Sequence, residues 1–158
     1  MKGTVEMELM SSAFDSGDSI PDKYTCLGEN ISPPLVWRTV PKGTKSLALV
    51  CDDPDAQNGM WSHWVLYDIP ADRQELPEGL EPKGRFPWGG VQGRNDFGGV
   101  GYGGPCPPMG ETHRYFWRLY ALDAPCALGA GATRAQLLDW AHDHTLGVAE
   151  LMGRFARS

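Results

Sequence analysis

A polar pair stands where an irregular segment of the sequence leads into a strand-like one. His113 and Tyr115 follow the Gly- and Pro-rich segment 101–110 and lie at the start of the aromatic and apolar run 114–122. Such a run has the residue types of a buried strand. As i and i+2 neighbours on an extended chain, the two side chains point to the same side. Because an imidazole and a phenol both donate hydrogen bonds, the spacing predicts a ligand site at this junction.

A second polar group connects two apolar segments earlier in the chain. Three aspartates follow the first segment, a turn-forming Asn-Gly pair comes next, and Trp61 and His63 lead into the second segment. The chain is expected to return on itself here, which could bring Asp53 close to His63. Asp52 and Asp55 are interpreted as turn formers or acceptors of N–H groups rather than as ligands.

The two groups together have the chemistry of an anion site. His63 and His113 can donate from ring nitrogens, Tyr115 can donate its hydroxyl, and a glycine-rich loop can turn backbone N–H groups toward a negative ligand. Asp53 would repel an anion, and two interpretations of it stay open. It orients a neighbouring imidazole and raises the pKa of that ring. Alternatively, it pairs with the ammonium of a zwitterion such as phosphoethanolamine, with the ring of Trp61 facing the same cation.

The elements that position these residues are mainly strands. Arg114 and Arg118 fall on the opposite side of their strand from His113 and are expected to form structural ion pairs. Half of the glycines lie between positions 84 and 110, and residues 71–112 predict a long loop whose aromatic side chains pack down. Alternating or continuous apolar residues predict strands at 4–10, 35–38, 46–51, 64–69 and 114–122.

One helix is expected near the end of the chain. Thr133 and Gln136 have the spacing of a capping box. An apolar stripe then predicts a helix as far as Phe155, with Gly147 as a possible bend. Its apolar positions are Leu137, Leu138, Ala141, Val148, Leu151, Met152 and Phe155. Strands, a long loop, another strand and a helix predict a mostly β protein, an antiparallel sandwich with a helix packed at one end.

Length and charge narrow the classes of function. With 158 residues, a single domain spanning 1–158 is expected. The net charge of -6 argues against nucleic acid and against an anionic membrane surface as partners. No stretch approaches the roughly 20 apolar residues of a membrane span, and the first residues lack a signal-peptide core, so a cytoplasmic protein without membrane insertion is expected. Reduced Cys26 and Cys106 are favoured there, although a bridge between them stays open.

The motifs resemble those of a known family. Asp-Pro-Asp at 53–55 followed by His63-Trp64, and the pattern GxxHRY at 110–115, look like the two signatures of the phosphatidylethanolamine-binding proteins, also called Raf kinase inhibitor-like proteins. Segments 24–35, 95–98, 101–108 and 119–123 are similar to the bacterial branch of that family. The similar segments cover most of the chain in the same order.

The resemblance implies a two-sheet antiparallel β-sandwich with a C-terminal helix. It also implies a small pocket for phosphate-like or carboxylate anions. Gln57 stands where the family commonly has a proline that shapes the pocket rim. The ligand-binding positions carried over by motif are Asp53, Trp61, His63, Pro107, Pro108, His113 and Tyr115.

The expected function is therefore non-enzymatic binding of a small phosphate-like or zwitterionic headgroup ligand, without a cofactor. The resemblance permits regulation of a protein partner, a kinase or a protease, and the sequence leaves a homodimer open. The alternative is a metal-assisted or general-base hydrolase using Asp53, His63 and His113, but neither an HExxH motif nor a GxSxG motif is present. A lipid carrier is less favoured, because the acidic chain has no polybasic segment.

Overall fold

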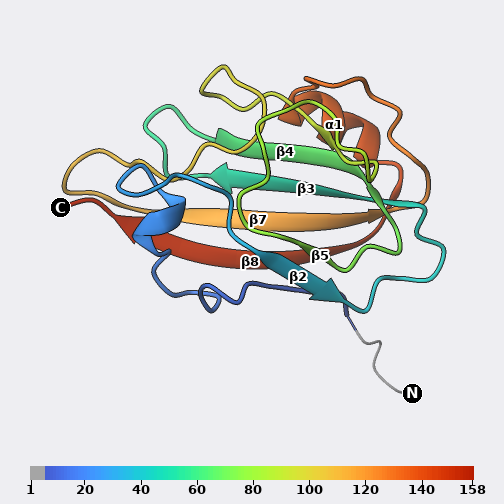
Figure 1. Ribbon diagram of the computed structural model, residues 1–158, viewed down its shortest axis with the longest axis horizontal. Coiled ribbons are helices and arrows are strands. Elements are labelled where there is room, and N and C mark those ends of the chain that lie inside the picture. Colours follow the sequence, from blue (N-terminus) through green and yellow to red (C-terminus); the bar gives the residue numbers. More distant parts are fainter. Residues whose placement is uncertain (1–5) are drawn as a thin grey trace.

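The computed structural model describes residues 6–158 and contains two antiparallel sheets (Figure 1). The larger sheet has the order β6-β4-β3-β7-β8, and the smaller has the order β1-β2-β5. The strands of the larger sheet are β3 (Ser46–Asp53), β4 (Trp61–Pro70), β6 (Val91–Gln92), β7 (Thr112–Leu122) and β8 (Thr145–Ala156). Those of the smaller sheet are β1 (Glu8–Met10), β2 (Leu35–Arg38) and β5 (Glu75–Leu76). One short 3-10 turn, η1 (Asp22–Tyr24), and one helix, α1 (Arg134–Ala141), complete the elements of the described part of the chain.

The larger sheet is covered on both faces, which explains why its central strand is apolar throughout. Leu47 and Leu49 of β3 belong to a core shared with Leu35 and Trp37 of the smaller sheet. Val50 belongs to a second core on the other face, where α1 packs. Every residue of β3 is buried. Because neighbouring residues of a strand face opposite sides, both parities of β3 must be apolar along most of its length.

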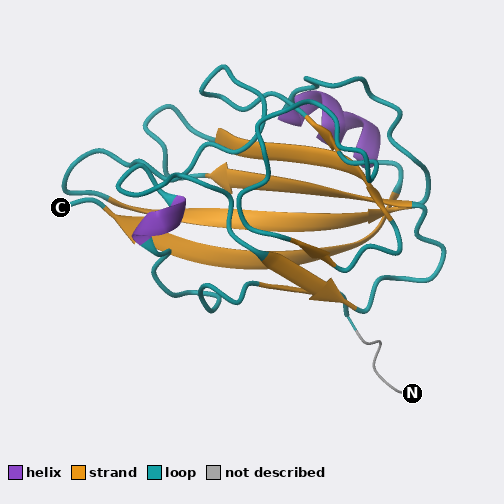
Figure 2. Cartoon of the chain, viewed as in Figure 1, coloured by secondary structure: helices purple, strands orange, loops and turns teal. Residues whose placement is uncertain are grey.

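The predicted strands are present, and most extend beyond the predicted bounds. Strands form the body of the molecule, and loops connect them at its ends (Figure 2). Strand 35–38 has the predicted limits, while β3, β4 and β7 are longer than predicted. Within the predicted strand 4–10, only Glu8–Met10 is a strand, and residues 4 and 5 lie outside the described part of the chain. The segment 71–112 is mainly loop, as predicted, interrupted by the two-residue strands β5 and β6.

The helix begins as predicted but is much shorter. Thr133 caps α1 in a capping box with Gln136, yet the helix ends at Ala141. The predicted extension to Phe155 is wrong, since residues 145–156 form β8 and pair with β7 along its whole length. Leu151 and Phe155 misled the prediction, because a spacing of four residues places side chains on one face in a helix and also in a strand.

Two distant loops are joined by a disulfide between Cys26 and Cys106. The prediction that these thiols are reduced is therefore wrong for this structure. The sequence leaves the bridge between these two cysteines open, and the expected cytoplasmic location favours the reduced form. The two positions are 80 apart in the sequence. The loops also share a hydrogen bond from the Cys26 N–H to the Pro105 carbonyl oxygen, 3.1 Å. Within residues 6–158, no helix is long and apolar enough to cross a bilayer.

Candidate functional site

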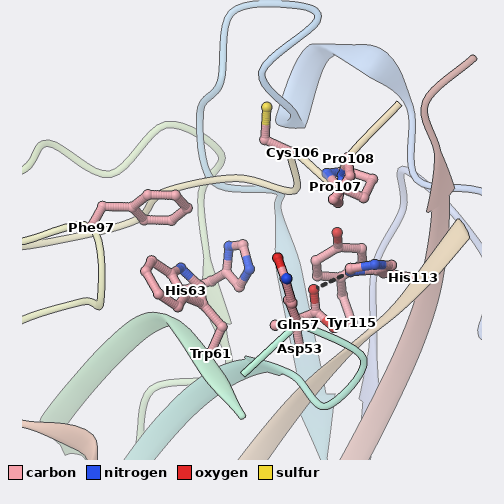
Figure 3. A pocket seen from close by; sticks show the side chains of 11 residues that line it. Asp53, Gln57, Trp61, His63, Phe97, Cys106, Pro107, Pro108, His113 and Tyr115 are labelled. Atoms are coloured by element: carbon pink, nitrogen blue, oxygen red, sulfur yellow. Dashed lines mark hydrogen bonds and ion pairs between the residues drawn. The ribbon is translucent and has the colours of Figure 1, made fainter. Parts of the chain in front are cut away.

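A small cavity lies at one end of the larger sheet (Figure 3). Its volume is about 180 Å³. The structure brings together all of the predicted positions on its wall: Asp53, Trp61, His63, Pro107, Pro108, His113 and Tyr115. Four further residues line the cavity: Ala56, Gln57, Phe97 and Cys106. The family resemblance places position 57 at the rim, and sequence reasoning missed the other three as lining residues. Phe97 belongs to the segment 95–98, which the family resemblance included, and Cys106 precedes the predicted Pro107, so both had a signal.

Three neighbouring strands bring the polar side chains to this end. Asp53 at the end of β3 pairs with Trp61 at the start of β4. Asp52 pairs with Phe116 of β7, which sets Asp53 beside the beginning of that strand. His113 and Tyr115 are both buried and share one face of β7, as their spacing predicts.

The side chains on the opposite face of β7 point away from the cavity, as predicted. Arg114 pairs with Asp55, with Nη2 and Oδ1 2.8 Å apart, and its backbone N–H also donates to that carboxylate. Arg118 pairs with Glu150, with Nε and Oε1 2.9 Å apart. These arginines therefore form the structural ion pairs that were expected.

The glycine-rich loop fixes the ring of His63. The Gly103 N–H donates to the His63 carbonyl oxygen at 2.9 Å, and His63 Nδ1 donates to the Gly103 carbonyl oxygen at 2.6 Å. A Cβ atom at position 103 would be only 2.5 Å from the ring of Phe97, so this close approach requires glycine. Asn95 orders the same loop by donating from its amide to the Gly101 carbonyl oxygen, 2.9 Å.

Asp53 contacts His113 rather than His63. Its Oδ2 lies 2.6 Å from His113 Nδ1, and its Oδ1 accepts the Asp55 N–H at 2.7 Å. Each carboxylate oxygen thus already accepts a hydrogen bond inside the protein. This geometry fits the interpretation in which Asp53 orients a neighbouring imidazole and raises its pKa. His63 and Asp53 line the same cavity, so the chain returns on itself as expected. The hydrogen-bond partner of Asp53, however, is His113 and not His63.

The other ring nitrogen of His113 also faces a carboxylate. Nε2 lies 2.7 Å from Oε1 of Glu111, a contact that sequence reasoning missed. The signal was available, because Glu111 is two residues before His113 and so shares its side of the extended chain. Burial opposes a charged ring, but the hydrogen bonds to Glu111 and Asp53 raise the pKa of His113 above its ordinary value.

His63 has the opposite electrostatic character. Burial lowers its pKa, and the hydrogen bond to the Gly103 carbonyl oxygen offsets only part of that effect. Since a carbonyl oxygen only accepts, the neutral ring carries its proton on Nδ1 and has a lone pair on Nε2. The nitrogen left for a ligand is therefore an acceptor, whereas the sequence predicted a donor.

Tyr115 supplies an unused donor. Its side chain is fully buried, and its hydroxyl has no hydrogen-bond partner within residues 6–158. Burial and the nearby charge of Asp53 raise the pKa of this hydroxyl well above its ordinary value, so it stays protonated. A buried hydroxyl without a partner is costly, and a ligand oxygen in the cavity would satisfy it.

Aromatic side chains line the cavity from two sides. His63, Trp61 and Phe97 lie on one side, and His113 and Tyr115 lie on the other (Figure 3). The Phe97 ring contacts Trp61 and His63, with ring centroids 5.5 and 5.2 Å apart. Phe97 is 52% exposed, so the expectation that the loop aromatics pack down is wrong for this residue.

Within residues 6–158, no group of three or more His, Cys, Asp or Glu side chains forms a metal-ligand cluster.

The chain matches one family profile and is similar in sequence to proteins from several microorganisms. A family profile described as phosphatidylethanolamine-binding protein matches residues 10–156. A relative from Methanothermobacter thermautotrophicus, named UPF0098 protein, is 52% identical over 151 residues, which cover 96% of this chain and 99% of the relative. An Aquifex aeolicus protein of the same name is 46% identical over 157 residues, which cover 98% of this chain and 91% of that relative.

Two solved structures have the same fold. The crystal structure of Escherichia coli YbcL, described as a new member of the mammalian PEBP family, gives a TM-score of 0.89 at 33% identity and covers 98% of this chain and 100% of that one. CT736 from Chlamydia trachomatis, described as a putative PEBP homolog, gives a TM-score of 0.87 at 40% identity, with coverages of 97% and 99%. The predicted fold class, two antiparallel sheets with one helix, is confirmed.

Proposed function

Because the chain belongs to the phosphatidylethanolamine-binding protein family, we propose that it is a non-enzymatic protein whose cavity binds a small phosphate-like or zwitterionic headgroup ligand. The observation that carries this proposal is the buried hydroxyl of Tyr115, which has no partner within residues 6–158 and lines the cavity beside His113 (Figure 3). A volume of about 180 Å³ suits a headgroup rather than a drug-sized molecule.

The hydrogen-bonding groups define the ligand more closely. Tyr115 donates, and His113 donates from a ring whose pKa is raised, so both need acceptor oxygens on the ligand. His63 presents a lone pair on Nε2 and needs a proton donor. A hydrogen phosphate, with its P–OH group, satisfies all three side chains, and so does a phosphate ester that carries an ammonium group.

The cavity wall is better suited to binding than to catalysis. Cys106 is held in the disulfide and offers no thiol nucleophile. The hydroxyl of Tyr115 has a strongly raised pKa and is a poor nucleophile. Asp53 already accepts one hydrogen bond on each oxygen, which leaves it less able to act as a base. Binding without reaction is therefore the function that these side chains support best.

Calorimetric titration of the protein and of the variant Tyr115→Phe with phosphate and with phosphoethanolamine tests the proposal. The wild type is expected to bind one ligand per chain. The variant should bind about 5- to 10-fold more weakly, because it lacks one donor. Its unfolding midpoint should be unchanged or slightly higher, since the hydroxyl makes no internal hydrogen bond. Absence of binding to both ligands, or equal binding by the variant, would contradict the proposal.

A protein partner is a further part of the proposal. Several large apolar side chains are exposed around the cavity mouth and in the adjoining loops: Met60, Trp61, Phe97 and Met109. Contiguous exposed apolar side chains mark interaction sites on many proteins, and the rings of Trp61 and Phe97 are in contact here. Occupancy of the cavity would then change the affinity of this surface for a kinase or a protease. The simplest alternative is that the same surface forms a homodimer. Light scattering with and without phosphate would distinguish a self-associating chain from a monomer.

A cytoplasmic location also stays a proposal. The disulfide between Cys26 and Cys106 argues against it, because cytosolic thiols are normally kept reduced. Fractionation of cells that express the tagged protein, with the thiols trapped at lysis, measures location and redox state together. Recovery outside the cytoplasm would overturn this part of the proposal without affecting the ligand site.

A further inference from the structure

The ring of His113 is held between two carboxylates. Its Nδ1 lies 2.6 Å from Asp53 Oδ2, and its Nε2 lies 2.7 Å from Glu111 Oε1. Ionised carboxylates only accept hydrogen bonds, so both contacts are hydrogen bonds only when the ring carries a proton on each nitrogen. An anionic ligand that bonds to His113 must use Nε2, because Nδ1 already donates to the buried Asp53. Ligand and Glu111 therefore need the same N–H group.

The two carboxylates differ in their freedom to move. The side chain of Asp53 is 5% exposed, whereas that of Glu111 is 55% exposed. The backbone of Glu111 is held on both sides: its N–H donates to the Pro108 carbonyl oxygen at 3.1 Å, and its carbonyl oxygen accepts the Arg157 N–H at 3.2 Å. Only the side chain is then free to leave. Solvent can hydrate the released carboxylate, so displacement costs little.

We propose that Glu111 is a built-in competitor for the anion site. In the free protein its carboxylate holds Nε2 of His113, and an anionic ligand must displace it before the ring can donate to the ligand. This inference rests on the proposed function and deepens it. Glu111 weakens the binding of simple anions, and its negative charge beside the ring of His113 disfavours a ligand with higher negative charge. It is a specificity-determining residue that acts through His113.

The contact also sets the protonation of His113 in the absence of ligand. The charged and titratable groups near this ring are Asp53 from β3, Glu111 from the segment before β7, Tyr115 from β7, His63 from β4, and the pair of Asp55 and Arg114 on the other face of β7. Replacing Glu111 by glutamine removes one of the two carboxylates that bond to the ring and leaves the others in place. The pKa of His113 should then fall toward its ordinary value.

The experiment compares the wild type, Glu111→Gln and the control Glu75→Gln, which removes the same charge at an exposed position of β5. Phosphate affinity is measured by calorimetry at pH 7, and the pKa of His113 is measured without ligand by NMR titration of its ring. Glu111→Gln is expected to bind phosphate about two- to fivefold more tightly than the wild type, because the competing carboxylate is exposed and its ion pair is correspondingly weak. The control should bind like the wild type.

Each outcome decides between the two proposals. Tighter binding by Glu111→Gln with a lower pKa of His113 supports the competitor. Equal or weaker binding by Glu111→Gln, while the wild type binds phosphate, overturns the competitor and leaves the proposed function intact. An unchanged pKa of His113 shows that the contact does not form in solution and overturns the competitor as well. Absence of phosphate binding by all three proteins overturns the proposed function, and the competitor with it.

Discussion

Two neighbouring aspartates at the end of β3 serve opposite faces of the sheet. Asp53 faces the cavity and bonds to His113, and each of its oxygens accepts a hydrogen bond. Asp52 faces the other side, where its Oδ1 lies 2.9 Å from Nε of Arg134 at the start of α1. That ion pair lacks hydrogen-bond geometry, and neither oxygen of Asp52 has a hydrogen-bond partner within residues 6–158. Adjacent strand positions thus have different surroundings.

The comparison distinguishes an aspartate whose partner can also bind a ligand from an aspartate whose partner has only a structural role. On the cavity face the partner is an imidazole, which can gain or lose a proton near neutral pH and can share its donors with a ligand. On the helix face the partner is a guanidinium, which stays charged. Burial raises the pKa of Asp52, and the charge of Arg134 offsets only part of that rise. Loss of Arg134 should therefore harm stability, whereas changes on the cavity face should also alter binding.

The largest effect is expected from Arg134→Met, which removes the ion pair with Asp52 on the helix side of the sheet and leaves the cavity side unchanged. The change leaves a buried carboxylate without its cation and should lower the free energy of unfolding at pH 7 by about 3–4 kcal/mol. Because the pKa of Asp52 is raised in the folded protein, the loss should shrink as the pH falls and Asp52 becomes protonated. Urea unfolding at pH 7 and pH 4 measures this.

Arg154→Met, at an exposed position of β8, is the matched control and should change stability by less than about 0.5 kcal/mol. Phosphate affinity of Arg134→Met should equal that of the wild type. A loss of affinity as large as the loss of stability would show that the two faces are coupled and would break the comparison.

The next largest effect is expected from removing the disulfide, which acts on the cavity face. The double variant Cys26→Ser with Cys106→Ser should lose about 2–3 kcal/mol of stability, since the unfolded chain regains the freedom of a long loop. Phosphate binding should also weaken, because Cys106 lines the cavity and precedes Pro107. Reductant should shift the unfolding midpoint of the wild type but not that of the double variant. An identical midpoint for both proteins, without reductant, would exclude a stabilising disulfide.

The smallest effect sharpens the comparison with a third aspartate. The hydrogen bond from Arg114 lowers the pKa of Asp55 from 3.8 to about 2, the direction opposite to that of Asp52. A lowered pKa contributes stability that is complete above pH 4 and is lost as the pH falls through about 2. Asp55→Asn should therefore lower the free energy of unfolding by about 1 kcal/mol at pH 6 and by much less near pH 2. The effect at pH 6 is small because solvent screens the ion pair with the half-exposed Arg114. A deficit that stays constant between these pH values would contradict the assignment.

Local sequence patterns predicted much of this molecule. The bounds of β2, the capping box at Thr133 and the shared face of His113 and Tyr115 depend only on residues close together in the chain. The motif resemblance added the residues of the cavity wall that no local pattern connects, namely Pro107 and Pro108.

Long-range contacts decided the rest. The segment 145–156 has apolar spacing that fits a helix or a strand, and pairing with β7 makes it a strand. The partner of Asp53, the bridge between Cys26 and Cys106, and the placement of Phe97 depend in the same way on which segments meet. Backbone periodicity determines which side of an element a residue faces, but only the packing of distant segments determines what it meets there.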